Sequence, residues 1–301
     1  MPYSLTRNFP FGKIKQNHSK LNKTERNGKG EKQKMKKKIL AALTAGILTT
    51  GLMTGTVFAA DTEVKGDENL KGEVYAFIAA SLSNSMEEIQ KDFNELYPNV
   101  TIYYSADSSG TLQTQIEEGL EADVFMSAAK KQMTALDEEG MIASDTITDL
   151  LENKIVLIVP TGNEKKLEKF EDIENADSIA LGDPASVPAG QYAQEALTNL
   201  GIWDKIQDKV SFGTNVTEVL NQVAAASADA GIVYATDAAS MADQVEVVAE
   251  APEGSLAKKV IYPVAVVKGT AHEEVAKEFV AFLQTDKAIT VFEDYGFSSA
   301  Q

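Results

Sequence analysis

Short apolar runs alternate with amphipathic segments along most of the chain, and this alternation constrains the fold more than any other feature. The runs 73–80, 100–104 and 123–126 are rich in Val, Ile, Tyr and Phe, which favour buried strands. After the first run, apolar residues recur at helical spacing, at Leu82, Met86, Ile89, Phe93 and Leu96. Strands that alternate with helices predict an α/β fold with mainly parallel sheets and helices on both faces.

A second set of the same kind follows a long apolar run at 154–160, and another long run lies at 259–267. Two βα sets joined by two extended crossings predict two lobes with a two-stranded hinge, and clefts between such lobes close on a ligand. The chain is expected to close with a helix over about 272–283 and a short tail. We therefore expect a first lobe, a second lobe and a return segment to the first lobe at 60–154, 155–260 and 261–301.

Residues 1–59 differ from the rest of the chain and are expected to be a leader. Residues 1–38 carry twelve Lys and Arg against two Glu, and the uncharged stretch 39–59 ends in Val57-Phe58-Ala59. A basic start, an apolar stretch and a small-x-small processing site predict a signal peptide and export to a periplasm or cell envelope. An uncleaved membrane anchor within 39–59 is the alternative, and Met35 is an alternative start to Met1.

The segment 60–301 is strongly acidic. The whole chain has a net charge of −17 and the leader contributes +10, which leaves −27 for this segment. Such a field repels nucleic acid and anionic lipid, so neither is an expected partner. The chain has no cysteine, and both arginines lie in the leader. These two absences exclude disulfides, a lipobox cysteine and Cys-based metal sites, as well as bidentate guanidinium capture of an anion within the segment.

Four predicted strand-to-helix corners carry small polar residues where a helix begins, at 79–83, 108–111, 187–190 and 215–217. A helix start leaves up to four amide N–H groups without partners and carries part of the positive helix dipole, so an oxyanion is a suitable guest. Capping or a first-turn proline would explain any single corner. In a parallel sheet, however, all four would lie at the carboxyl edge of the strands, where ligands bind.

Five segments resemble, in order and spacing, the substrate-binding protein of the molybdate ABC transporter, the ModA family. They are FIAASLSNSMEEI, SADSSGTLQTQIEEG, ADVFMSA, GDPASVPAGQYAQEAL and AGIVYATDA, and the likeness extends over residues 73–298. The resemblance implies the two-lobed type II fold of periplasmic binding proteins. It also implies that the protein hands its oxyanion to a membrane permease, and we expect it to act as a monomer.

By this resemblance the oxyanion contacts fall on five residues. Ser81 and Ser109 would contribute hydroxyl and amide groups from the first lobe, while the second lobe would contribute the amides of Ala189 and Val216 and the hydroxyl of Tyr234. All are uncharged donors, which suits molybdate and tungstate because these ions are fully ionised. Monohydrogen phosphate carries a proton that would meet no acceptor, and sulfate would be too small. Molybdenum would be bound only as molybdate, and we expect no other metal ion or cofactor.

Asp107 departs from the family pattern, because the family loop usually has serine or alanine two residues before Ser109. A carboxylate that faced the cleft would repel a dianion or accept the proton of phosphate. A binding protein for sulfate, phosphate or another small anion therefore stays open as an alternative. The other expectation for Asp107 is that it caps local amides.

A hydrolase or transferase that uses the serine corners on an anionic substrate is a further alternative. It would need an acid or base, and Asp107 and Asp183 are the candidates near the corners. No histidine lies near Ser81 or Ser109 in the sequence, so we expect no catalytic residue and no enzyme activity. His272 has no partner nearby in the sequence and is expected on the surface.

Overall fold

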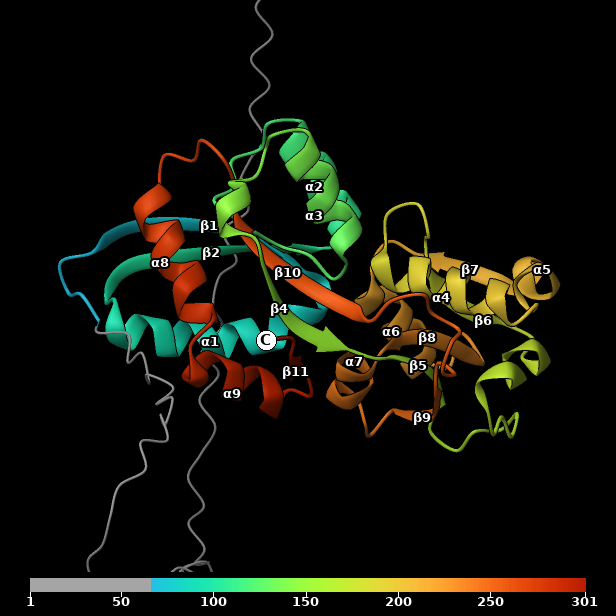
Figure 1. The fold of residues 1–301 in the computed structure, drawn as a ribbon. Helices are drawn as coiled ribbons and strands as arrows, with labels where there is room; N and C mark the ends of the chain where they lie inside the picture. Colours follow the sequence, from blue (N-terminus) through green and yellow to red (C-terminus); the bar gives the residue numbers. More distant parts are fainter. Residues whose placement is uncertain (1–65) are drawn as a thin grey trace, which may run out of the picture. The chain divides into compact units, whose positions relative to one another are not determined.

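A computed structural model describes residues 66–301, which form two β-sheets with helices packed against them (Figure 1). The predicted leader, its processing site and the alternative start lie outside the described residues. Within the described part, no helix has both the length and the apolar composition that crossing a bilayer requires.

The first sheet contains six strands in the order β11-β4-β10-β3-β1-β2. Their bounds are β1 (Lys71–Ala79), β2 (Asn99–Asp107), β3 (Val124–Met126), β4 (Thr148–Asn153), β10 (Val260–Val266) and β11 (Ser298–Ser299). The second sheet has the order β7-β6-β8-β5-β9. Its strands are β5 (Ile155–Pro160), β6 (Ile179–Gly182), β7 (Val210–Gly213), β8 (Ala230–Tyr234) and β9 (Val245–Glu250).

Each sheet combines parallel and antiparallel pairs. The strands of the βα units pair in parallel, β1 with β2 and β3, and β6 with β7 and β8. β4, β5 and β10, which lie next to the changes of sheet, pair antiparallel with their neighbours. The α/β class is therefore confirmed, while the mainly parallel pairing holds only for the βα units, because the crossing strands enter each sheet from the opposite direction.

The chain changes sheet between Asn153 and Ile155, and again between Glu250 and Val260. Both changes occur in or beside the long apolar runs of the sequence. The lobe limits at residues 154 and 260 stay a prediction.

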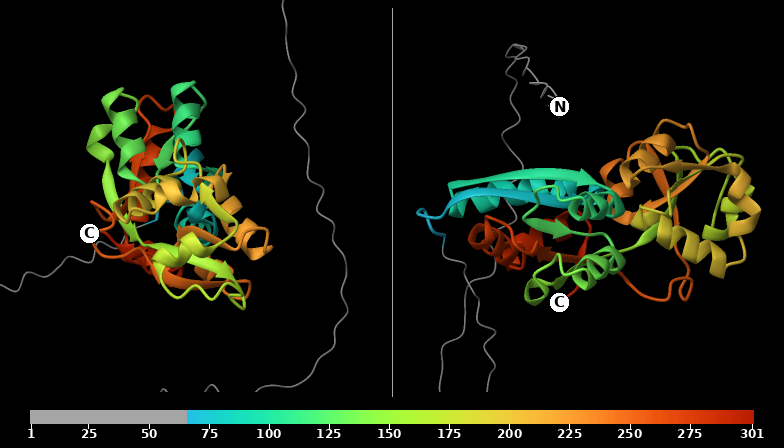
Figure 2. Two further views of the ribbon diagram at one scale, coloured as in Figure 1. Left: turned by 90° about the vertical axis from the view of Figure 1, so that its right-hand side faces the viewer. Right: turned by 90° about the horizontal axis from the view of Figure 1, so that it is seen from above.

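Helices cover both faces of the first sheet, as Figures 1 and 2 show. They are α1 (Ser83–Leu96), α2 (Ser109–Glu117), α3 (Lys130–Glu138), α8 (Glu273–Leu283) and α9 (Asp286–Asp294). The second sheet is accompanied by α4 (Pro188–Asn199), α5 (Trp203–Ile206), α6 (Val216–Ala224) and α7 (Ala235–Ser240). The expected short tail after residue 283 is wrong, because α9 packs against α1 and the chain then adds β11 to the first sheet.

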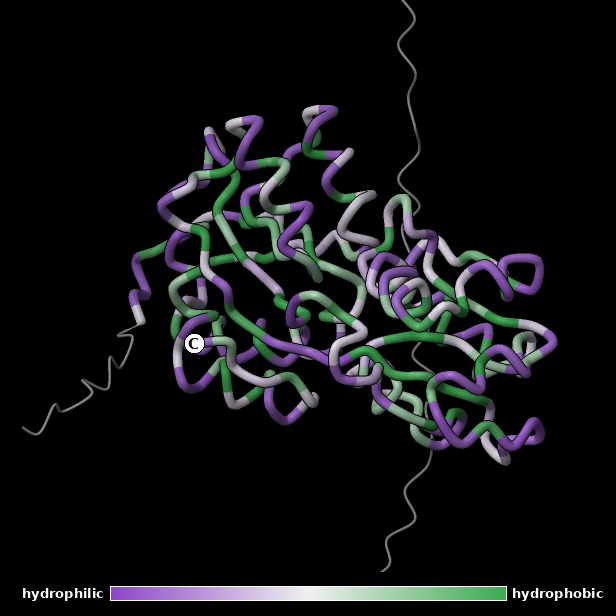
Figure 3. Tube along the Cα trace, turned by 45° about the vertical axis from the view of Figure 1, so that its right-hand side comes forward, coloured by the Kyte–Doolittle hydropathy of each residue, from purple (hydrophilic) through white to green (hydrophobic). Residues whose placement is uncertain are grey.

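Alternate side chains of β1 serve two apolar clusters, as expected for a strand buried on both faces. Phe77 packs with Leu112 and Met133, which come from α2 and α3. Ile78 belongs to the larger cluster, which includes residues of α1 and α8. Figure 3 shows the same arrangement as hydrophobic colour along the strands and hydrophilic colour on the outer turns.

Phe93 of α1 has no exposed surface and lies at the centre of an aromatic group. Its ring stacks on Tyr97 at a centroid distance of 4.5 Å and meets Phe279 and Phe282 edge-on at 5.1 and 5.3 Å. These contacts fix α1 against α8, and thereby the helix that follows the first polar corner.

We expect Phe93→Ala to lower the free energy of unfolding by about 3–5 kcal/mol, because it removes a buried ring from a close-packed group. Urea denaturation monitored by circular dichroism measures this change. Phe212→Ala is the matched control, since Phe212 is 47% exposed, and it should change the same quantity by less than about 0.5 kcal/mol. Equal losses in the two variants would contradict the assignment of Phe93 to the core.

Candidate functional site

All four polar corners lie at helix starts that follow strands. β1 leads into α1 through the 3₁₀ turn Ala80–Leu82, and β2 leads directly into α2. β6 and β7 precede α4 and α6 in the same way. The predicted placement of the corners at the carboxyl ends of strands is therefore confirmed.

Local sequence explains how two of these helices begin. Ser108 caps α2, because its Oγ accepts a hydrogen bond from the Thr111 N–H at 3.2 Å. Asn215 caps α6, with its Oδ1 accepting from the Glu218 N–H at 3.0 Å. Pro188 is the first residue of α4, a position where the missing N–H costs nothing. The amides of Ser109, Ala189 and Val216 also lie in the first turns of α2, α4 and α6, where a helix leaves N–H groups without an intrahelical partner.

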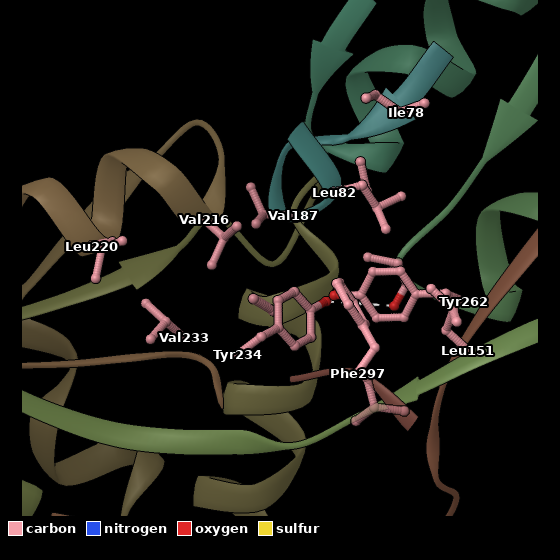
Figure 4. Packing of buried hydrophobic residues seen from close by; sticks show 14 of the residues in the cluster. Ile78, Leu82, Leu151, Val187, Val216, Leu220, Val233, Tyr234, Tyr262 and Phe297 are labelled. Atoms are coloured by element: carbon pink, nitrogen blue, oxygen red, sulfur yellow. Dashed lines mark hydrogen bonds between the residues drawn. The ribbon is translucent and has the colours of Figure 1, made fainter. Parts of the chain in front are cut away.

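One small pocket, of about 10 Å³, is lined by all five residues that were expected to contact the oxyanion. Ser81 and Ser109 lie in the 3₁₀ turn and in α2, which follow strands of the first sheet. Ala189 and Val216 lie in α4 and α6, which follow strands of the second sheet, and Tyr234 ends β8 of that sheet. Ser81 is partly exposed, whereas the other four are buried. The rest of the lining consists of Ala79, Ala80, Asp107, Ser108, Ala128, Val187 and Pro188. Figure 4 shows Val216 at the start of α6 and Tyr234 at the end of β8, with the Tyr234 hydroxyl directed toward Tyr262.

Asp107 is the one charged residue in the lining of this pocket. Its Oδ1 accepts hydrogen bonds from the Ser108 N–H at 2.7 Å and from Nδ2 of Asn215 at 3.3 Å. The carboxylate therefore caps a local amide, as one of the two expectations held, and it also lies at the pocket. Its contact with Asn215 joins the α2 corner to the α6 corner, which sequence reasoning did not anticipate.

Two further contacts join elements of the two sheets around the pocket. The Gly110 N–H donates to the carbonyl oxygen of Ser186 at 2.9 Å. The hydroxyl of Tyr234 donates to the carbonyl oxygen of Ala128 at 3.4 Å. Together with the contact between Asp107 and Asn215, these bonds bring the helix starts of both sheets together at the pocket.

The hydroxyl oxygen of Ser109 already accepts a hydrogen bond within the protein. Its Oγ accepts a hydrogen bond from the Ala128 N–H at 2.9 Å. A hydroxyl group carries one proton, and that of Ser109 remains available to a ligand. The hydroxyl of Ser81 lies 3.0 Å from the hydroxyl of Tyr262, a residue of β10.

The two tyrosines at the site are neutral donors. Burial raises the pKa of Tyr234 and of Tyr262 well above the ordinary value, so both phenols keep their protons. Burial also raises the pKa of Asp237 to about 7. Asp237 lies in α7, directly after β8, and is not part of the pocket lining.

Of the two acid or base candidates, Asp107 lines the pocket, whereas Asp183 does not. Asp183 has its Oδ1 bonded to the Ala185 N–H at 2.9 Å and organises the turn before α4. His272 lies only partly at the surface: its side chain is 27% exposed, and its Nδ1 lies 3.2 Å from the carboxylate of buried Asp123, a partner that is distant in the sequence. Among residues 66–301, no cluster of His, Cys, Asp or Glu could hold a metal ion.

Sequence reasoning missed Tyr262, whose hydroxyl reaches Ser81 from the second crossing strand. The signal was a tyrosine in the otherwise aliphatic run KVIYPVAVV. It also missed Ala128, whose N–H donates to Ser109 and whose carbonyl oxygen accepts a hydrogen bond from Tyr234.

Comparison with known proteins gives consistent matches. Residues 74–298 match the family described as bacterial extracellular solute-binding protein. The chain is 39% identical over 267 residues to the molybdate-binding protein ModA of Haemophilus influenzae, covering 87% of this chain and 99% of the relative. It is 38% identical over 234 residues to ModA of Escherichia coli, covering 76% of this chain and 90% of the relative.

A solved structure shares the fold. The periplasmic molybdate-binding protein of Azotobacter vinelandii matches with a TM-score of 0.67 at 22% identity, over 76% of this chain and all of the other. This likeness confirms the periplasmic-binding-protein fold expected from the sequence.

We expect Gly190→Ala to weaken ligand binding about 10- to 100-fold. A Cβ on Gly190 would lie 2.0 Å from the carbonyl oxygen of Gly182, so the first turn of α4 must move and carry the Ala189 amide away from the pocket. Losing one hydrogen bond to a charged ligand costs about 1.5–3 kcal/mol. Isothermal titration calorimetry with molybdate measures the effect.

The control for Gly190→Ala is Thr198→Ala, an exposed position near the other end of α4. It should leave the dissociation constant within about twofold of the wild-type value. Wild-type affinity in Gly190→Ala would show that the start of α4 does not position the ligand.

Proposed function

The chain belongs to the bacterial extracellular solute-binding proteins and, within them, to the ModA family, and from this premise we propose that it captures molybdate or tungstate and delivers it to an ABC permease. The observation that carries the proposal is the single pocket lined by Ser81, Ser109, Ala189, Val216 and Tyr234. These residues would bind the oxyanion through amide and hydroxyl groups alone.

Neutral donors can hold a dianion in a protein that is itself acidic. Helix starts and hydroxyl groups present the positive ends of their dipoles at hydrogen-bond distance. The remote surface carboxylates act over longer distances, and salt screens them within about 8 Å at physiological ionic strength. The site therefore needs no arginine, and the segment 60–301 has none.

Donor-only chemistry also supports the choice of ligand. Molybdate and tungstate offer only acceptor oxygens, so the hydroxyls of Ser81 and Ser109 and the amides of Ala189 and Val216 would all donate to them. The Tyr234 hydroxyl would donate by leaving the carbonyl oxygen of Ala128, which lies 3.4 Å away. Monohydrogen phosphate would bring a proton into a site of donors, which costs about 1–3 kcal/mol when it finds no acceptor. Sulfate has shorter bonds and would not reach donors spaced for a larger tetrahedron.

The proposal extends to how the protein works outside the cytoplasm. Its two lobes, with limits near residues 154 and 260, would close on the ion, and the closed form would dock on the permease as a monomer. Residues 1–59 would direct export, and with no cysteine in the chain the exported protein would carry no lipid-modified cysteine. We propose no cofactor and no enzymatic step.

A binding protein for monohydrogen phosphate is the second candidate, and Asp107 is the observation that favours it. Its carboxylate lines the pocket and could accept the phosphate proton through Oδ2. Oδ1 is already bonded to Ser108 and Asn215. The presence of a negative charge at the pocket edge thus makes phosphate the ion to test beside molybdate.

Thermal unfolding of the purified protein in the presence of molybdate, tungstate, sulfate and phosphate tests the proposed ligand. A ligand at 1,000 times its dissociation constant stabilises the native state by about 4 kcal/mol. For a folded unit of this size that corresponds to a rise in Tm of roughly 8–16 °C. We expect such a rise with molybdate and tungstate only, and a larger rise with phosphate would transfer the assignment to the second candidate.

We expect Asp107→Asn to bind molybdate about fivefold or more tightly than the wild type, because it removes a like charge from the pocket edge. The asparagine Oδ1 can still accept from Ser108 and Asn215, so the contact between the corners is kept. Calorimetric titration compares it with Asp243→Asn, a change at an exposed carboxylate that should leave the affinity unaltered. Weaker molybdate binding in Asp107→Asn would show that the carboxylate supports the site.

A further inference from the structure

A chain of hydrogen bonds runs from Ser81 at the pocket through residues of β10 and β4 to α7, a helix beside the second sheet. The hydroxyls of Ser81 and Tyr262 are 3.0 Å apart. Nδ2 of Asn153, the last residue of β4, lies 3.3 Å from the Tyr262 hydroxyl and 2.9 Å from Oγ1 of Thr236 in α7. Asn153 is 5% exposed and Tyr262 is fully buried, so water does not compete for these groups.

The orientation of the Asn153 amide is fixed by its neighbour in the chain. Oδ1 of Asn153 accepts a hydrogen bond from the Lys154 N–H at 2.8 Å. Nδ2 must then face Tyr262 and Thr236, and an amide nitrogen can only donate. The Tyr262 oxygen therefore accepts from Asn153. Its own proton can go to either of two hydroxyls, that of Ser81 or that of Tyr234 (Figure 4).

The bond between Ser81 and Tyr262 can run in two directions, and they have opposite consequences for the pocket. If Tyr262 donates, the Ser81 proton is left for a ligand. If Ser81 donates, it presents only lone pairs to the ligand, and the Tyr262 proton needs a different acceptor. An oxyanion without protons can bind the Ser81 hydroxyl as a donor only in the first arrangement, in which Tyr262 donates to Ser81 while it accepts from Asn153.

The other serine of the pocket is arranged in the same way. Oγ of Ser109 accepts from the Ala128 N–H, a donor that cannot reverse. Tyr262 takes the corresponding place behind Ser81, but with a hydroxyl in place of an amide. Both serines can thus direct their protons inward, and only that of Ser81 depends on another side chain.

On the basis of the function proposed above, we propose that Tyr262, held by Asn153, is a positioning residue that donates to Ser81 and so turns the Ser81 hydroxyl proton toward the oxyanion. Tyr262 does not line the pocket and acts only through Ser81. Because burial raises the pKa of Tyr262 well above its ordinary value, the donor is present throughout the physiological pH range.

A double-mutant cycle tests this role. Molybdate affinity is measured by isothermal titration calorimetry for the wild type, Ser81→Ala, Tyr262→Phe and the double variant. We expect Tyr262→Phe to weaken binding about five- to tenfold when Ser81 is present. In the Ser81→Ala background the same change should weaken it by less than about twofold, because the group through which Tyr262 acts is gone.

Tyr104→Phe is the matched control, since it removes a hydroxyl that donates to the carbonyl oxygen of Met86 at 3.1 Å in the first sheet's own helix layer. It should not change the affinity. A merely structural role of Tyr262 would give equal losses in both backgrounds, and that result would overturn the proposal.

Running the cycle with tungstate, sulfate and phosphate as well separates the two proposals. If the wild type bound sulfate or phosphate instead of molybdate, the proposed function would fail, and the coupling measured with the bound ion would still decide the role of Tyr262. If the wild type bound molybdate and the two changes were additive, only the role of Tyr262 would fail.

Discussion

The structure depends on uncharged hydrogen-bond donors that two separate sheets bring to one point. Helix starts after β1, β2, β6 and β7 meet at a pocket that includes Ser109 and Ala189. Each start supplies amides that the helix cannot satisfy by itself. A site of this kind can exist only where the carboxyl ends of strands from both sheets face each other, so the fold and the site have the same cause.

Close backbone packing holds these donors in place. Gly190 lies so near Gly182 that even a methyl group would not fit, and α4 therefore begins directly against β6. The Ala128 N–H donates to the hydroxyl of Ser109, and the Tyr262 hydroxyl is hydrogen-bonded to that of Ser81. Both pocket serines are therefore held by groups within the protein. Fixed dipoles of this kind need little rearrangement when an anion arrives, which is how a site without countercharge can bind one.

Local features of the site could be predicted from the sequence, but its long-range contacts could not. Ser108, Asn215 and Pro188 mark helix starts by their own chemistry, and the resemblance to ModA supplied the five pocket residues. The contact between Ser81 and Tyr262 spans 181 residues, and that between Asp107 and Asn215 spans 108. Such pairs depend on how the sheets face each other, which periodicity does not encode.

A crystal structure of the protein with molybdate would show whether neutral donors alone hold the ion. We expect the ion in the pocket, with its oxygens within hydrogen-bond distance of the amides of Ala189 and Val216 and of the hydroxyls of Ser81, Ser109 and Tyr234. No lysine would lie in contact with it. An ion held by lysine side chains, or bound away from these five residues, would show that the helix starts and hydroxyls do not form the binding site.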